Sequence, residues 1–434
     1  MSRLSIQLAG RMLIGFAFAQ PFAAPGQTID LTALTLAQAE GLLQTRSREL
    51  QAARRAVEAA GANTLAAGAH PNPTLSLGVS QINPGAGIGA GPYRDKTVDS
   101  TVRIDQVIER GDRRELRIAA ARSLESASSE DLSDTYRQQR LALRSGYYDL
   151  VFAQDKTDIA RDNAQLFETS MRAAELRLRA GDIAQADVSR LRVDALRAAN
   201  DARAAEADRR RAQLALAYLI GADTESAVIR AADPWPALAA VNNAGITDEL
   251  IDRRPDVRAA RARVEAAGQA RDLARSLRTR DVSVGMQFDH YPVNPGYALG
   301  SGAGAGSSYG VFLSIPLFAR YQFEGEIRRA EVDYATATEA LEKVRALARS
   351  ELARALSDLQ ATAERLKRYD ESLLPEARKA AESAEFAYKN GAIGVMDLLD
   401  SRRTQRAIQI DAASARNDYS KALSVWLAGT GNLD

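Results

Sequence analysis

The sequence has no cysteine and only two histidines among its 434 residues. The absence of cysteine excludes disulfides, thiolate metal sites, cysteine nucleophiles and the lipid anchor that a bacterial lipoprotein carries on an N-terminal cysteine. The histidines, His70 and His290, lie far apart in the sequence, and there are only five methionines. We therefore expect no bound metal and no cofactor.

An excess of charge of one sign is also missing. The chain has 57 lysines and arginines against 56 aspartates and glutamates, so its formal net charge is +1. Without a basic field the chain is poorly suited to the phosphate backbone, and no nucleic acid is expected as a partner. Because no segment has the pattern of a phosphate-binding loop or a catalytic cluster, we also expect no enzymatic activity.

Long hydrophobic runs are confined to the N-terminus. Two arginines precede the apolar run 12–19, which ends in Ala17-Phe18-Ala19, small residues at the positions that signal peptidase reads. The pattern predicts a signal peptide at 1–19, followed by an N-terminal segment at 20–34. The alternative is a buried N-terminal helix, which two following prolines disfavour. Since no other stretch approaches the roughly 20 apolar residues of a spanning helix, any passage through a membrane would use strands.

The remainder of the chain repeats itself. Val57-Glu58-Ala59-Ala60-Gly61 recurs as Val264-Glu265-Ala266-Ala267-Gly268, and two further blocks recur in the same order. Chance similarity between alanine-rich helices explains one such match more easily than three collinear ones. The sequence therefore predicts repeat 1 at 35–220, a linker at 221–246, repeat 2 at 247–429 and a C-terminal tail at 430–434.

Each repeat contains two short segments in which apolar and polar residues alternate. Leu75 and Leu77, for example, alternate with Ser76 and Gly78. A period of two predicts strands with one apolar and one polar face. The predicted hairpin strands lie at about 73–82 and 97–107 in repeat 1 and at about 281–291 and 307–316 in repeat 2. The glycine-rich segments between paired strands predict long exposed loops.

Proline is absent between Pro92 and Pro234, and the segment 112–181 is rich in alanine, arginine, leucine and glutamate. This composition, with apolar residues at threes, fours and sevens, predicts long antiparallel helices. Roughly 70 helical residues would span about 105 Å, more than an ordinary globular core requires.

Four strands with one apolar face cannot close or hide their edges in lipid, where unpaired backbone groups are costly. Three copies of the chain would supply about twelve strands, a number that membrane barrels use. The alternative is a soluble hairpin cap on a coiled coil.

Several short motifs stand in a characteristic order along the chain: Leu34-Thr35-Leu36, Asn72-Pro73, a glycine-centred turn at Gly181, Arg253-Arg254-Pro255-Asp256, Ile315-Pro316-Leu317-Phe318 and a second glycine-centred turn at Gly391. In this order they resemble the TolC-like outer membrane efflux proteins over essentially the whole mature chain. Segments 177–190 and 314–322 are most similar to the branch that serves heavy-metal pumps, of the cobalt-zinc-cadmium type, in the resistance-nodulation-division (RND) class.

The resemblance implies a mainly α fold with a small β part. It also implies a homotrimer in which a 12-stranded outer-membrane β-barrel continues into a periplasmic α-helical barrel. The implied partners are outer membrane lipid, a periplasmic membrane fusion adaptor and an inner-membrane RND transporter. The implied function is passive conduction, most simply of heavy-metal cations, to the exterior. The alternatives are a channel of the same fold for drugs or type I protein secretion, or a non-conducting periplasmic scaffold.

The family also suggests where the mechanism lies. Gly181 and Gly391 match its periplasmic tip turns, which we expect to dock the adaptor. Asp397 and Asp400 match its aperture aspartates, and their spacing places both carboxylates on one helical face. The alternative for these two residues is an ordinary solvated helix face.

A gate latch is implied by Tyr388 and Asp187, which match a tyrosine–aspartate pair that closes the family's aperture. Core packing is the alternative for Tyr388. The sequence departs from the family where some members have a second link with an arginine, because Ile393 stands at that position and Ala186 at its partner.

Overall fold

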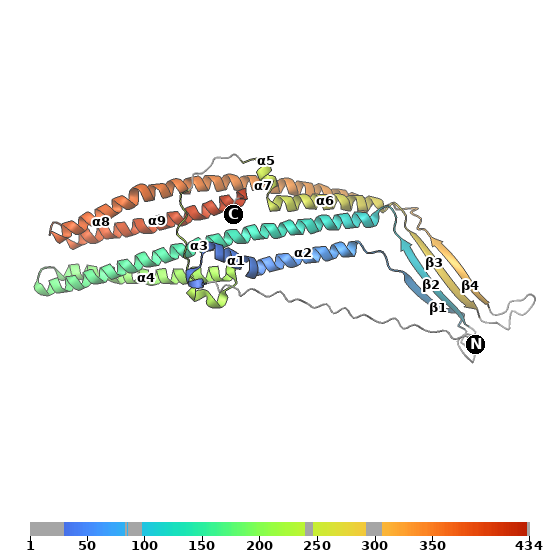
Figure 1. Ribbon diagram of the computed structural model, residues 1–434, viewed down its shortest axis with the longest axis horizontal. Coiled ribbons are helices and arrows are strands. Elements are labelled where there is room, and N and C mark those ends of the chain that lie inside the picture. Colours follow the sequence, from blue (N-terminus) through green and yellow to red (C-terminus); the bar gives the residue numbers. More distant parts are fainter. Residues whose placement is uncertain (1–29, 83–84, 86–97, 239–245, 292–305, 432–434) are drawn as a thin grey trace, which may run out of the picture.

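The computed structural model describes residues 30–82, 85, 98–238, 246–291 and 306–431. Within them the chain is a long helical body with one small sheet at one end (Figure 1). The prediction of a mainly α fold with a small β part is therefore confirmed. The predicted signal peptide and most of both predicted glycine-rich loops lie outside the described residues.

The helices fall into two groups, one in each half of the chain, and each group includes short turns of helix. No helix among the described residues is both long and apolar enough to cross a membrane. The first group comprises η1 (Leu31–Ala33), α1 (Leu36–Arg46), α2 (Arg48–Ala67), α3 (Arg113–Ala180), α4 (Gln185–Ile220) and η3 (Asp223–Val228). The second comprises α5 (Asp248–Asp252), α6 (Pro255–Ser276), α7 (Glu324–Arg368), the π-helical turn η5 (Tyr369–Leu373), α8 (Leu374–Lys389) and α9 (Val395–Thr430).

The sheet is antiparallel and unites the two halves of the chain. Its strands lie in the order β1 (Thr74–Ser80), β2 (Asp99–Ile108), β3 (Val282–Tyr291) and β4 (Gly306–Ser314). Strand β2 from the first half pairs with β3 from the second, which leaves β1 and β4 as the edges. An edge strand presents unpaired backbone groups that can pair with another strand.

The two faces of the sheet differ in chemistry. On one face, large apolar side chains are open to solvent, with Leu77 exposed by 73%, Val311 by 76% and Tyr309 by 84%. On the other face, the Thr101 hydroxyl donates to Asp289 at 2.7 Å, and Arg103 pairs with its neighbouring carboxylate Asp105 at 2.8 Å. The sheet therefore has an apolar surface that no described part of the chain covers and a hydrogen-bonded polar surface on its other side.

Arginines at the start of α3 hold the corner between the sheet and the helices. The Arg113 guanidinium donates to the carbonyl oxygens of Leu277 at 3.1 Å and Thr279 at 2.5 Å, just beyond the end of α6. Arg114 donates to the Gly68 carbonyl at 2.7 Å, at the end of α2. One helix thus caps the C-terminal carbonyls of two others, which otherwise lack partners.

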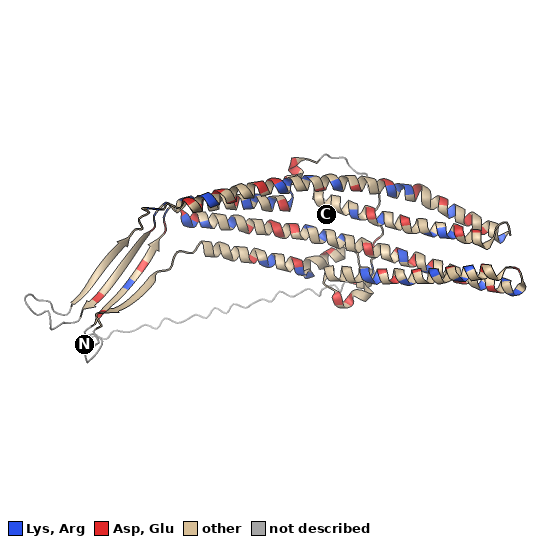
Figure 2. Ribbon diagram, turned by 180° about the vertical axis from the view of Figure 1, so that it is seen from behind, with Lys and Arg blue, Asp and Glu red and all other residues tan. Residues whose placement is uncertain are grey.

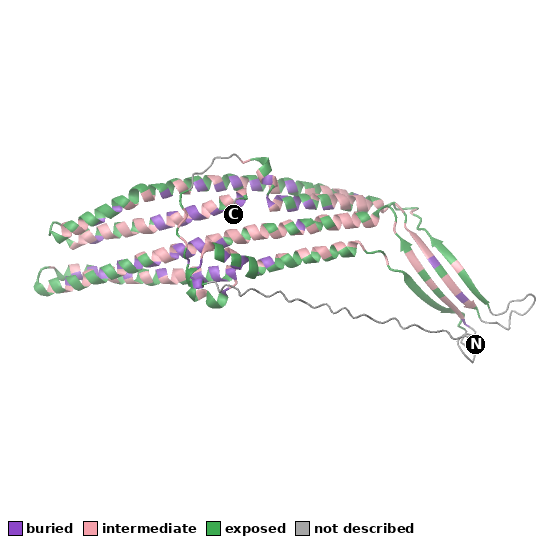
Figure 3. Cartoon of the chain, in the orientation of Figure 1, coloured by how far each residue is buried: buried purple, intermediate pink, exposed green. Residues whose placement is uncertain are grey.

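The main core lies in the middle of the long axis, where α1, α3, α4 and the linker meet (Figure 3). The buried Tyr147 hydroxyl is 2.9 Å from both the Leu34 carbonyl oxygen and the Asp233 carboxylate. Burial raises the pKa of this hydroxyl. Trp235 stacks on Tyr148 at 6.1 Å between ring centroids, so the linker is fastened to α3.

A buried charge cluster fixes the start of α6. Arg254 is only 5% exposed, and its guanidinium pairs with Asp256 at 2.7 Å and with Glu351 of α7 at 2.8 Å. Burial by itself would raise the pKa of Asp256, but the hydrogen bonds and charge of Arg254 outweigh it, so the pKa is lowered. The arginine–carboxylate contact connects the start of the second half of the chain to its longest helix.

Candidate aperture at the helical tips

Two turns of the same geometry form the tips of the molecule, at the end far from the sheet (Figure 1). Gly181 ends α3 with φ +82°, and Gly391 follows α8 with φ +73°. The Asp182 N–H donates to the Arg177 carbonyl at 2.9 Å, and the Ala392 N–H donates to the Ala387 carbonyl at 2.8 Å. This is the Schellman arrangement, in which glycine takes the left-handed conformation at little cost.

The two predicted aperture residues lie in the first turns of α9, beside the second tip. Asp397 and Asp400 are both exposed. The Gly394 N–H donates to the Asp397 carboxylate at 3.2 Å, which fixes that side chain at the helix N-terminus, where the helix dipole favours negative charge. Neither carboxylate forms an ion pair with any residue that the structure describes. Their charge is therefore available to a solute.

The predicted latch residues do not meet. The Tyr388 hydroxyl accepts a hydrogen bond from the Arg177 guanidinium at 3.0 Å, which joins α8 to α3. Asp187 instead faces Arg190 of its own helix at 4.0 Å. In this conformation no hydrogen bond connects Tyr388 to Asp187. Tyr388 is partly exposed, so it does not belong to the buried core.

Two ion pairs connect the helical hairpins near their tips, and neither was predicted from the sequence. Arg406 of α9 pairs with Asp201 of α4 at 3.0 Å, and Arg403 pairs with Asp194 one heptad nearer the tip. Beside them, Leu399 packs into the buried cluster of α3 and α4. The seven-residue spacing of the two aspartates was the signal that could have indicated a charged helix face. Figure 2 shows such charges alternating in sign along the helices, with few on the strands.

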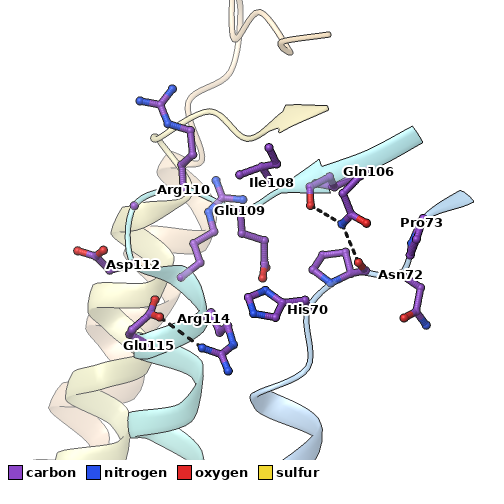
Figure 4. A pocket seen from close by; sticks show the side chains of 14 residues that line it. His70, Asn72, Pro73, Gln106, Ile108, Glu109, Arg110, Asp112, Arg114 and Glu115 are labelled. Atoms are coloured by element: carbon purple, nitrogen blue, oxygen red, sulfur yellow. Dashed lines mark hydrogen bonds and ion pairs between the residues drawn. The ribbon is translucent and has the colours of Figure 1, made fainter. Parts of the chain in front are cut away.

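A pocket of about 570 Å³ lies at the opposite end, where the strands meet the helices (Figure 4). His70 lines it, and Gln106 donates to the Pro71 carbonyl at 2.8 Å across its edge. The other histidine, His290, has its Nδ1 3.4 Å from the Ser307 hydroxyl. Among the described residues, no group of three or more histidines, aspartates or glutamates could hold a metal ion.

The arrangement of a four-stranded sheet and two helical hairpins corresponds to a known family. The family model described as "Outer membrane efflux protein" matches residues 41–222 and again residues 246–425. The chain belongs to this outer membrane efflux protein family. The resemblance inferred from the sequence motifs is confirmed. The protein is thus an outer-membrane efflux channel, not an enzyme, and its helical part lies in the periplasm.

Individual relatives agree with this assignment. The cobalt-zinc-cadmium resistance protein CzcC of Cupriavidus metallidurans is 25% identical, over 86% of this chain and 84% of CzcC. The pyoverdine export outer membrane protein OpmQ of Pseudomonas putida is 24% identical, over 88% of this chain and 84% of OpmQ. The solved structure of the Campylobacter jejuni CmeC outer membrane channel matches with a TM-score of 0.74 at 14% identity, covering 99% of this chain and 94% of CmeC. This last likeness shows a shared fold.

Proposed function

We propose that three copies of this chain form the outer-membrane channel of a tripartite RND-class efflux pump. In this proposal the trimer passively conducts heavy-metal cations from the periplasm and the inner-membrane transporter to the exterior. A periplasmic membrane fusion adaptor and the RND transporter are its partners, and the transporter supplies the energy. The observation that carries the proposal is the sheet, with its exposed apolar face, its polar opposite face and its two unpaired edges.

The edges explain why copies are needed. In one chain the sheet has four strands, so β1 and β4 keep unpaired backbone groups. Pairing β1 of one copy with β4 of the next removes every edge, and three copies of four strands give a closed sheet of twelve. The apolar face with Leu77 and Val311 then contacts lipid, and the face with Arg103 and Asp289 lines water.

The proposed aperture is formed where the helical tips of the three copies come together. Three copies of Asp397 and Asp400 around one axis form two stacked rings of carboxylates. Such rings attract cations. The exposure of both side chains and the absence of ion pairs to them among the described residues support this role.

The two tip turns are the proposed adaptor contacts. A side chain added at Gly181 or at Gly391 would meet no described atom within 4 Å, so both turns are open to a partner. Cross-linking from residues beside these turns should capture the adaptor. Cross-links found only at the sheet end would contradict this placement.

The proposed heavy-metal cargo rests on the name of one relative. CzcC, at 25% identity, is named for cobalt, zinc and cadmium resistance. OpmQ, at 24%, is named for pyoverdine export, so an organic cargo is the second candidate. In the proposed pump the choice between them belongs to the transporter and the adaptor, and the acidic rings merely favour cations.

Resistance measurements separate these cargoes. A strain without the gene is compared with the wild type for growth in zinc, cobalt and cadmium salts and, in parallel, in a panel of dyes and antibiotics. Sensitivity to the metals alone, restored by the intact gene, supports the proposed cargo. Sensitivity to the organic compounds alone shifts the assignment to a drug channel, while the proposed tube and its partners stand.

A further inference from the structure

The apolar face of the sheet ends in a corner that is basic. After β4, Ile315 and Leu317 are 42% and 79% exposed and continue the apolar surface. Beyond them the chain turns toward α7, and the segment before β3 runs beside it. Exposed arginines gather on these segments and at the end of β2: Arg110, Arg278, Arg280 and Arg320.

Contacts between the segments hold the corner together. The Arg280 guanidinium lies over the Phe318 ring at 5.7 Å, and the Arg278 Nε donates to the Gln322 carbonyl at 3.3 Å. Phe318 meets Phe323 edge to face at 5.0 Å between centroids. We call the four arginines together with Leu317, Phe318 and Tyr321 the basic corner.

The positive charge of the basic corner is only partly offset by carboxylates among the described residues. No ion pair among the described residues involves any of its four arginines. Nearby acids are already occupied: Asp281 pairs with Arg113 at 2.5 Å, and Glu109 pairs with Arg117. The nearby carboxylates without an ion pair among the described residues are Asp112, Glu324 and Glu326, three against four arginines. Glu324 accepts a hydrogen bond from the Gln322 N–H at 3.0 Å, and Glu326 accepts one from the Tyr321 hydroxyl at 2.5 Å.

We infer that the basic corner binds the phosphodiester headgroup of anionic glycerophospholipids in the periplasmic leaflet of the outer membrane. The inference rests on the proposed insertion of the sheet into that membrane. Guanidinium groups suit this ligand because their fixed fork of donors matches two phosphate oxygens. Leu317 and Ile315, on the sheet side of the arginines, would contact the acyl chains.

The combination of charge and exposed apolar surface selects a lipid over a free anion. Inorganic phosphate could satisfy the guanidinium groups but would leave Leu317, 79% exposed, in water. In the view of Figure 4 the Arg110 guanidinium lies at the opposite side of the pocket from His70. Tyr321, 50% exposed, adds an amphipathic ring of the kind that membrane–water interfaces favour.

The test compares lipids on the full-length trimer. The trimer is reconstituted in equimolar phosphatidylglycerol and phosphatidylcholine vesicles and re-extracted in mild detergent, and the lipids retained on each protomer are identified by native mass spectrometry. We expect enrichment of phosphatidylglycerol on the wild type. Since a basic residue near an anionic surface contributes about five-fold in affinity, Arg280→Gln with Arg320→Gln should weaken retention roughly five- to thirty-fold.

The matched control removes two charges farther from the sheet. Arg328 and Arg329 on α7 have side chains exposed by 78% and 85%, so Arg328→Gln with Arg329→Gln should keep the enrichment. Arg280→Lys with Arg320→Lys should keep part of the enrichment, because the charge remains but the guanidinium fork is lost. Added inorganic phosphate should not displace the lipid.

The outcomes are distinct. Equal retention of both lipids by the wild type, equal loss in both double variants, or displacement by phosphate overturns the inference. Bilayer conductance of the same samples is the second measurement. Conducting trimers without lipid preference leave the proposed channel intact and remove only the inference. A wild type that does not insert overturns both.

Discussion

The Tyr388 hydroxyl accepts a 3.0 Å hydrogen bond from the Arg177 guanidinium, and this contact joins the α8–α9 hairpin to the α3–α4 hairpin close to the tips. Because Arg177 is exposed and Tyr388 is partly exposed, this charged hydrogen bond contributes at most on the order of 1 kcal/mol. In the proposed aperture, opening would separate the two hairpins, so we expect this bond to favour the closed state.

Tyr388→Phe should therefore raise the open probability of single channels about five-fold, the factor that corresponds to about 1 kcal/mol. Arg177→Gln should do the same. Arg179→Gln is the control, since Arg179 is exposed two residues away and has no hydrogen bond or ion pair with the described residues. If Asp187→Asn opens the channel and Arg177→Gln does not, the latch of the assembled trimer is the tyrosine–aspartate pair expected from the family.

The left-handed turns give a second prediction. At Gly391, with φ +73° and open space around it, alanine would be strained by its backbone and not by a clash. The cost is about 1–2 kcal/mol, so amide hydrogen exchange at the tip of Gly391→Ala should accelerate roughly ten-fold. Gly394→Ala is the control because its φ is −77°. Unchanged exchange in the Gly391 variant would show that the tip is not held in this turn.

The buried cluster at the start of α6 predicts a pH dependence. The pKa of Asp256 is lowered in the folded chain, since Arg254 outweighs the effect of burial. Its contribution to stability is therefore complete above the ordinary carboxyl pKa of about 4 and disappears as the pH falls through the lower folded value. Asp256→Asn should cost about 1–3 kcal/mol at neutral pH, because Arg254 keeps only Glu351.

Thermal melting of the trimer at a series of pH values measures this effect. The gap in melting temperature between wild type and Asp256→Asn should be constant near neutrality and should close below about pH 4. Asp333 forms an exposed ion pair with Arg329, with 3.8 Å between the nitrogen and the oxygen. Asp333→Asn should therefore have the melting temperature of the wild type at every pH. A gap for Asp256→Asn that widens in acid would contradict the assigned direction of the pKa shift.

Much of the fold could be predicted from local patterns in the sequence. The period-two segments around Leu75 and Val282 lie in β1 and β3, and the glycines at 181 and 391 do stand in left-handed turns. These features depend on a few neighbouring residues and on backbone sterics. The family motifs supplied the rest of the architecture, because periodicity alone left open a soluble coiled coil.

Side-chain pairing across helices could not be predicted in the same way. Whether Tyr388 meets Asp187 or Arg177 depends on the rotation and axial shift of α8 against α3, and a rotation of one residue is 100°. The contacts of Arg113 and Arg114 at the start of α3 were likewise not predicted. Their partners are backbone carbonyls at the ends of α2 and α6, which carry no residue-type signal.

We propose that the assembled protein is a conducting tube with an acidic aperture. The most direct test is single-channel conductance of the detergent-purified trimer in a planar bilayer, with a trivalent cation added on the helical side. We predict cation-selective steps that the trivalent cation blocks, and loss of the block when Asp397→Asn and Asp400→Asn are combined. A trimer that inserts without conducting, or a block that persists in the double variant, would contradict this account.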